Sequence, residues 1–295
     1  MESALSGRRP RTDVVFDPVV WPRFAGDLQR VENTVLANSA KSARAVGSLI
    51  EETELEMAYS INWRDVQPKI AHLSAVHWGG LRDKQRDDDP DGRNRLVALG
   101  GFARHALQGR KTSDHHKHEN LEQVYYILSG AGEVLFDEQR FPVREGDAVY
   151  LPAGIYHQMF NDMNDDWLVH HVISQEVEGP GGDFAISHWS DVRPESDGSG
   201  AVRWRQFGQL GEGGIGLLRS MRGIERESVQ PGGRSAERCQ PYEQVFYGLE
   251  NGAVLVDADG RQSFVEGDMV HVPAEHAYHV VNEGETWMSY LIMSA

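Results

Sequence analysis

Residues 114–161 read DHHKHENLEQVYYILSGAGEVLFDEQRFPVREGDAVYLPAGIYHQMFN, and this stretch decides the fold. Short apolar runs such as 124–128 and 148–151 are separated by Gly, Pro and charged turns, which is typical of a β-meander. We therefore expect a small β-barrel here.

The same stretch contains a set of nitrogen and oxygen donors. His116 and His118 are two residues apart, so on a strand both imidazoles point the same way and can converge on one point. Gln123 opens the next apolar run, and His157 follows a Pro-x-Gly turn that can bring it back across the barrel. Four such donors on a closed scaffold predict a site for a divalent transition metal.

These residues also occur at the spacing of a known family. The first group has the pattern H-x-H, four residues, Q, six residues, G, and the second has G, five residues, P-x-G, two residues, H, three residues, N. The positions are His116, His118, Gln123 and Gly130, followed by Gly146, Pro152, Gly154, His157 and Asn161. The segment thereby resembles the cupin superfamily, which implies a jelly-roll barrel (a double-stranded β-helix) with a metal at its centre.

The fourth ligand leaves one alternative open. Gln123 stands where the family usually has Glu, and the adjacent Glu122 supplies a carboxylate if the strand slips by one residue. The six-residue gap to Gly130 favours Gln123, because a slip would also turn Tyr125 and Ile127 out of the barrel. A neutral amide leaves the full charge of the ion uncompensated, so the ion would polarise a bound oxygen more strongly.

Length, charge and cysteine content limit the number of domains, the kind of partner and the compartment. A chain of 295 residues is long enough for two domains. A formal net charge of -16 argues against nucleic acid and anionic membrane surfaces as partners, and favours a small molecule. The single cysteine, Cys239, fits a reducing compartment, and no secretory signal or membrane span is visible. We expect a cytoplasmic protein.

An internal repeat divides the chain. An offset of 121 lays Gln123 on Gln244, and the same shift aligns Gly146, Pro152 and Asn161 with Gly267, Pro273 and Asn282. We therefore predict an all-β bicupin with two tandem barrels. The predicted parts are an arm and helical extension over 1–57, a metal-binding barrel over 58–175, a linker over 176–200 and a second barrel over 201–295.

The offset also predicts what the second barrel has lost. It replaces His116 by Glu237, His118 by Cys239 and His157 by Tyr278, so we expect no second metal site. The alternative is a rearranged site in which Glu237 and Cys239 are joined by His276 or His279.

The function predicted from these residues is that of a metal-dependent enzyme acting on a small oxygen-rich substrate. One Fe, Mn, Ni, Cu or Zn ion per chain would be held by the four donors, with Tyr125 and His170 as candidate catalytic residues. The resemblance favours a non-heme dioxygenase. The alternatives are a Lewis-acid isomerase, lyase or cyclase, and a metal-dependent small-molecule sensor. The resemblance and two Trp-bearing strands also predict a homodimer.

The acidic loop 83–95 offers a second, weaker pattern. Asp87, Asp88 and Asp89 stand together and have ligand character, but a charge run of this composition is typical of a solvated turn.

Overall fold

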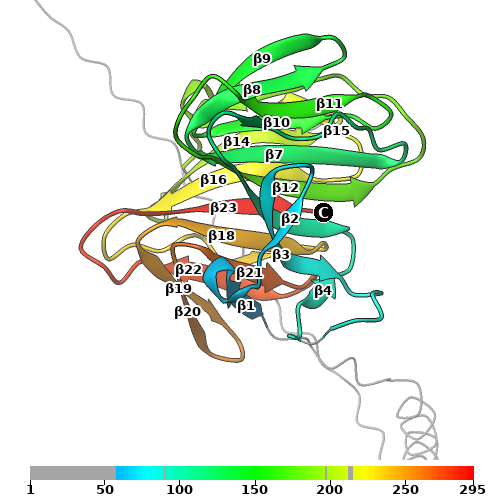
Figure 1. The fold of residues 1–295 in the computed structure, drawn as a ribbon. Coiled ribbons are helices and arrows are strands. Elements are labelled where there is room, and N and C mark those ends of the chain that lie inside the picture. The colour runs from blue at the N-terminus through cyan, green and yellow to red at the C-terminus, as the bar shows by residue number, and fades with distance from the viewer. Residues whose placement is uncertain (1–57, 90, 197, 212–214) are drawn as a thin grey trace, which may run out of the picture. The chain divides into compact units, whose positions relative to one another are not determined.

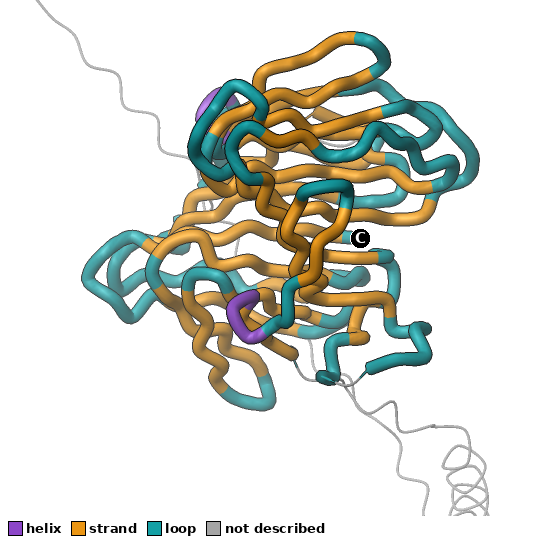
Figure 2. Tube along the Cα trace, viewed as in Figure 1, coloured by secondary structure: helices purple, strands orange, loops and turns teal. Residues whose placement is uncertain are grey.

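The computed structural model describes residues 58–89, 91–196, 198–211 and 215–295. These residues are almost entirely strand and loop, as Figure 2 shows. The helical elements among them are two 3₁₀ turns, η1 (Trp63–Asp65) and η2 (Trp189–Asp191). The all-β class is confirmed, and the predicted helical extension lies outside the described residues. None of the helices in this described part is long and apolar enough to cross a membrane.

The first barrel has a large and a small sheet. The large sheet runs β13-β10-β7-β12-β5-β3-β2, with β4 paired to β3, and the small sheet runs β6-β11-β8-β9. The strands of the large sheet are β2 (Lys69–Ala71), β3 (Ala75–Asp83), β4 (Asn94–Leu96), β5 (Gly101–Leu107), β7 (Leu121–Ser129), β10 (Asp147–Leu151), β12 (Leu168–Glu176) and β13 (Ala185–His188). Those of the small sheet are β6 (Lys111–Thr112), β8 (Ala131–Phe136), β9 (Gln139–Arg144) and β11 (His157–Asn161).

The second barrel repeats this plan. Its large sheet runs β1-β21-β18-β23-β16-β14-β15 and its small sheet β17-β22-β19-β20. The large sheet contains β1 (Tyr59–Asn62), β14 (Ala201–Gln209), β15 (Ile215–Leu218), β16 (Gly223–Val229), β18 (Gln244–Glu250), β21 (Asp268–Val272) and β23 (Met288–Ser294). The small sheet contains β17 (Arg238–Cys239), β19 (Gly252–Asp257), β20 (Arg261–Val265) and β22 (Ala277–Val281).

Each half gives its first strand to the other barrel. β1 pairs with β21 of the second barrel, and β13 pairs with β10 of the first. The exchanged segments are themselves repeats, YSINWRDVQP at 59–68 and AISHWSDVRP at 185–194. The equivalent Trp63 and Trp189 donate their backbone N–H to Gly267 and Gly146 respectively. The predicted linker 176–200 therefore contains a paired strand, which its glycines and acids had hidden in the sequence.

Three apolar cores follow from this arrangement. One fills the first barrel around Ile127 and Val149, and one fills the second around Phe246 and Ile292. The third lies between the large sheets, which contribute residues such as Phe102, Tyr126, Phe207, Tyr247 and Leu291. In Figure 1 the small-sheet strands β8, β9 and β11 lie at the top and β19, β20 and β22 at the bottom. The two barrels thus share a buried apolar interface and need not be stable separately.

Two equivalent buried glutamates, which we call the inter-barrel glutamates, cross this interface. Glu122 accepts hydrogen bonds from the backbone N–H groups of residues 219, 220 and 221 at 2.8, 2.8 and 2.6 Å. Glu243 accepts from those of residues 97, 98 and 99 at 2.8, 2.8 and 2.7 Å. Each carboxylate is also bonded by a side chain of its own half, Tyr150 for Glu122 and His271 for Glu243. A carboxylate buried in this way is satisfied only when the two barrels are packed against each other, so it stabilises that packed arrangement alone.

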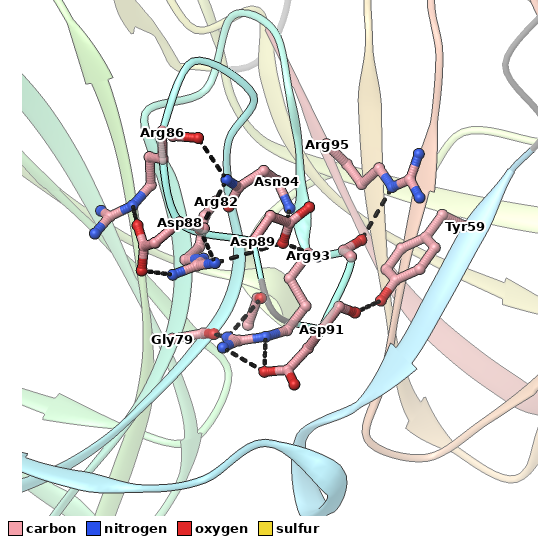
Figure 3. Close-up of polar contacts among 12 residues, drawn as sticks. Tyr59, Gly79, Arg82, Arg86, Asp88, Asp89, Asp91, Arg93, Asn94 and Arg95 are labelled. Atoms are coloured by element: carbon pink, nitrogen blue, oxygen red, sulfur yellow. Dashed lines mark hydrogen bonds and ion pairs between the residues drawn. The ribbon is translucent and has the colours of Figure 1, made fainter.

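The acidic loop 83–95 is held by arginines of its own neighbourhood (Figure 3). Arg82 forms ion pairs with Asp88 and Asp89 at 3.1 and 3.4 Å, and Arg93 pairs with Asp91 at 3.0 Å. Asp89 also accepts from the backbone N–H of Arg93 at 2.6 Å. Asp88, Asp89 and Asp91 thus bind arginines of the loop and of the adjacent strand β3.

We predict that Glu122→Gln lowers the free energy of unfolding by about 2–4 kcal/mol, because it removes the charge that three N–H groups share. Urea denaturation measures the change. The matched control is Glu119→Gln, since Glu119 is exposed and its ion pair with Lys117 lies at the surface. Equal unfolding midpoints for both variants would contradict the role of the inter-barrel glutamates.

A second prediction concerns acid. Burial raises the pKa of Glu243, but the hydrogen bonds from His271 and from the backbone of residues 97–99 outweigh burial and lower it below its usual value. The stability it contributes is therefore present above the unfolded pKa of about 4.3 and is lost as the pH falls through the lower folded pKa. We expect the melting temperatures of wild type and Glu243→Gln to differ most near neutral pH and to converge below about pH 4. A difference that grows on acidification would refute this assignment.

Candidate metal centre

The centre forms where the loop before β7 meets the first residue of β11. His116 and His157 are cross-strand partners, joined by backbone hydrogen bonds of 3.2 and 2.8 Å. The carbonyl of His118 accepts from the N–H of Gly154 at 2.7 Å. The histidine pair was predicted to lie on a strand, but His116 forms an isolated bridge and His118 lies in the loop beyond it. The loop is nevertheless fixed on both sides by backbone bonds.

Three imidazoles converge at this point. The ligating nitrogens of His116, His118 and His157 all lie within 4.8 Å of one another. The ring centroids are separated by 4.5 Å between His116 and His157 and by 4.9 Å between His116 and His118. Three histidines at this separation fit around one ion, because each contributes a single nitrogen at about 2.0–2.1 Å from it.

The donor atoms themselves lack protein partners. Nε2 of His116, Nε2 of His157 and Oε1 of Gln123 are buried with no hydrogen-bond partner. On the opposite side of each ring, Nδ1 of His116 faces the carbonyl of Asp114 at 3.3 Å, and Nδ1 of His157 faces that of Ile155 at 3.2 Å. A proton on Nδ1 satisfies these carbonyls and leaves the Nε2 lone pairs open. The residues therefore fit a metal ion.

Electrostatics favour the same state. Burial, with the neighbouring imidazole of His116, lowers the pKa of His157 to about 3 and also lowers that of His118. Both rings are therefore neutral near pH 7, which is the form that binds a metal.

The side chain of Glu122 faces away from this centre. Its carboxylate is fully buried among the N–H groups of the other half, as described above. Gln123 is the adjacent residue on β7, so strand alternation turns it to the opposite face. These contacts favour Gln123 over Glu122 as the fourth donor.

The candidate catalytic residues lie beside the histidines. Tyr125 on β7 contacts the ring of His157 at a centroid distance of 6.1 Å and that of His170 on β12 at 5.1 Å. Burial raises the pKa of the Tyr125 phenol well above its usual value and lowers the pKa of His170 to about 3. His171 points to the other side, between Phe102 and Tyr247. Tyr125 and His170 are thus a neutral phenol and a neutral imidazole on the inner wall.

The structure adds three histidines that the sequence did not single out. His72 stacks on His116 at 4.9 Å and bonds Asp114 at 3.0 Å, while Nδ1 of His77 lies 2.6 Å from Nε2 of His105. The sequence did contain a signal for His77 and His105, because each occupies one of the alternating positions of a strand that precedes the histidine motif. His72 gave none: it stands in a turn with φ 47°, followed by Leu73 with φ 70°. Left-handed backbone at two consecutive non-glycine residues costs of order 1–3 kcal/mol each.

The structure of the second barrel shows that one prediction, the alignment of the two repeats by a constant offset, is wrong in one place. The gap-free offset is wrong just before Gln244, since Arg238 pairs with Tyr278 as His116 pairs with His157. The N–H of Glu275 likewise bonds the carbonyl of Gln240, as that of Gly154 bonds His118. The counterparts of His116 and His118 are therefore Arg238 and Gln240, because the following loop is one residue shorter.

A guanidinium accordingly replaces an imidazole in the second barrel. Arg238 donates to Glu227 at 3.0 Å, Tyr290 donates to the same carboxylate, and Tyr278 donates to Gln244 at 2.5 Å. Glu237 and Cys239 are exposed, and His276 is paired with Asp257 at 2.8 Å. Among the described residues, Glu237, Cys239 and a histidine do not come together as a ligand group.

Comparison with known proteins agrees with this geometry. The profile of the cupin domain family matches residues 104–173. This part of the chain is therefore similar to a cupin domain. The two barrels give the chain a bicupin-like architecture.

Two curated relatives match parts of this chain. An uncharacterized protein of Methanocaldococcus jannaschii is 41% identical over 46 residues, which are 16% of this chain and 37% of that protein. An oxalate-binding protein of Thermotoga maritima is 34% identical over 65 residues, 22% of this chain and 54% of that protein. The matches thus span about half or less of these relatives.

Solved structures share the fold over most of both chains. A glyoxylate-induced protein of Pseudomonas aeruginosa has a TM-score of 0.68 at 16% identity, covering 81% of this chain and 90% of that chain. Oxalate decarboxylase of Lactobacillus farciminis, in a formate complex, has a TM-score of 0.60 at 13% identity, covering 80% and 85%. A bacterial pirin of Escherichia coli, in complex with nickel(II), has a TM-score of 0.63 at 13% identity, covering 80% and 98%.

We predict that Mn(II), Ni(II) or Zn(II) raises the melting temperature of the wild type and binds once per chain, because among the described residues a group of three converging histidines is found in the first barrel alone. His157→Ala should lose this stabilisation, which amounts to about 2.7 kcal/mol for the wild type at a metal concentration of 100 Kd. Cys239→Ser is the matched control and should keep both the shift and the stoichiometry. Thermal melts with elemental analysis measure both quantities, and two equivalents per chain would contradict the assignment.

Proposed function

We propose that the first barrel binds one divalent transition metal through His116, His118, Gln123 and His157, and that the bound ion holds a small oxygen-rich organic acid for oxidation. The observation that carries the proposal is the set of buried, unpartnered donor atoms on three of these residues. Buried polar atoms ordinarily have partners, so such a group at one point indicates a missing ligand.

The ion would act as a Lewis acid toward the acid's oxygen atoms and, if it is iron or manganese, would also supply redox chemistry. The chain's own part is positional. The carbonyls of Asp114 and Ile155 fix the tautomers of His116 and His157. Tyr125, a phenol that stays protonated, can donate a hydrogen bond to an oxygen of the substrate, and the apolar core around Ile127 and Val149 excludes water beside it.

The names of the similar proteins support the substrate class. They refer to oxalate, glyoxylate and formate, which are small acids with closely spaced oxygen atoms. We infer a substrate of the same kind, a short carboxylic or oxo acid that chelates the metal.

A second candidate is metal-dependent binding without turnover. One observation favours it: neither Tyr125 nor His170 pairs with a carboxylate among the described residues, so neither has a partner that would make it a strong base. The redox and non-redox enzymes, the homodimer and the cytoplasmic location remain predictions.

The test is binding followed by turnover. We expect oxalate or glyoxylate to bind the metal-loaded wild type, to bind His116→Ala at least tenfold more weakly, and to drive oxygen consumption with Fe(II). Calorimetry and an oxygen electrode measure the two steps, with Cys239→Ser as control. Turnover under zinc without oxygen would replace oxidation by Lewis-acid chemistry, and binding without turnover would favour the second candidate. Equal binding by His116→Ala would refute the site.

A further inference from the structure

A row of three imidazoles crosses the inner face of the first barrel. His77 on β3 is the cross-strand partner of His105 on β5, and His105 is the partner of His170 on β12. The ring centroids are 4.7 and 5.4 Å apart. We call these residues the histidine row. Its last member contacts Tyr125, whose ring also contacts the metal-site residue His157. The row therefore leads into the candidate metal centre.

The second barrel has the same row with different side chains. There Arg203 pairs with Glu227, and Glu227 pairs with Tyr290. These three satisfy one another: Arg203 donates to Glu227 at 3.1 Å, and the Tyr290 hydroxyl donates to the other oxygen of that carboxylate. In the barrel without the three converging histidines, the row is thus closed by an internal ion pair.

The row of the first barrel is left open. His77 and His105 share one hydrogen bond of 2.6 Å, but Nδ1 of His170 is buried with no partner, and this side chain is only 3% exposed. The metal does not account for this atom, because His170 is not in the group of nitrogens that converge on the centre. A second polar group of the ligand would satisfy it.

The surrounding charges indicate the sign of that group. Among the described residues none of the three imidazoles is hydrogen-bonded or ion-paired to a carboxylate. The charged groups that act on His170 are His72, which is paired with the carboxylate of Asp114 at 3.0 Å, and the positive Arg104. Lys69 adds a positive charge near His77. A divalent metal ion would add two further positive charges, so the electrostatic field along the row favours the binding of an anion.

We propose that the histidine row binds the second carboxylate of a dicarboxylic acid longer than oxalate, whose first carboxylate lies on the metal. This inference rests on the proposed function and narrows its substrate class. His170 donates to the distal carboxylate from Nδ1, and the His77–His105 hydrogen bond fixes the ring that lies next to it.

The experiment compares malonate, succinate and glutarate with their own monomethyl esters, by calorimetry on the metal-loaded protein. Each ester keeps the length and one carboxylate but removes the second charge. We expect at least one diacid to bind about 10- to 100-fold more tightly than its ester, the range for a hydrogen bond to a charged group. His170→Phe, which keeps a ring in place, should abolish that preference while leaving metal affinity unchanged.

The controls separate the outcomes. His279→Phe makes the same substitution in the second barrel and should keep the preference. His170→Asn, which restores a donor near the position of Nδ1, should recover part of it, and His105→Phe gives a second variant if His170→Phe does not fold. A preference that survives in both His170→Phe and His105→Phe, or is absent from the wild type, overturns the inference. If metal-loaded wild type bound oxalate but no diacid preferentially, the proposed function would stand and this inference would fall.

Discussion

Burying a polar atom costs free energy unless the atom finds a partner, and the two barrels meet this constraint in opposite ways. In the second barrel the guanidiniums of Arg203 and Arg238 are neutralised by the carboxylates of Glu225 and Glu227, with the phenols of Tyr278 and Tyr290 in the same network. In the first barrel the equivalent interior positions carry imidazoles, and several of their nitrogens face no protein group. The buried charges of the second barrel are therefore satisfied within the chain, whereas the unpartnered nitrogens of the first are available to the proposed ligand.

The rest of the fold holds this open interior in place. Because β1 and β13 are exchanged, each barrel includes one strand from the other repeat, and neither is made of one repeat alone. The inter-barrel glutamates add two buried charges that only the assembled pair can satisfy. The second barrel, which lacks counterparts of the three converging histidines, thereby holds the candidate metal centre of the first barrel in place through these shared strands and buried charges.

Backbone strain occurs in the first barrel beside the candidate metal centre. His72 and Leu73 are held in left-handed conformations at the tip of the β2–β3 hairpin, and this turn places His72 on His116 and beside Asp114. Backbone strain persists where surrounding contacts over-determine it, and here those contacts are with a candidate metal ligand. The metal centre is consequently supported from the hairpin as well as from β11.

The sequence determined the all-β class and the duplication, because apolar alternation and a constant offset between repeats can be read along the chain. The motif spacing also indicated that His116, His118 and His157 approach one another, although the first two lie on a bridge and a loop and not on a strand. Tertiary structure decided what depends on pairing between distant segments. It showed the exchanged strands, replaced Glu237 and Cys239 by Arg238 and Gln240 as counterparts, and turned Glu122 toward the other half. It also assembled His77, His105 and His170 into one row. These residues are up to 93 positions apart along the chain, so the sequence gives no signal that they are neighbours, and only the sheet register brings them together.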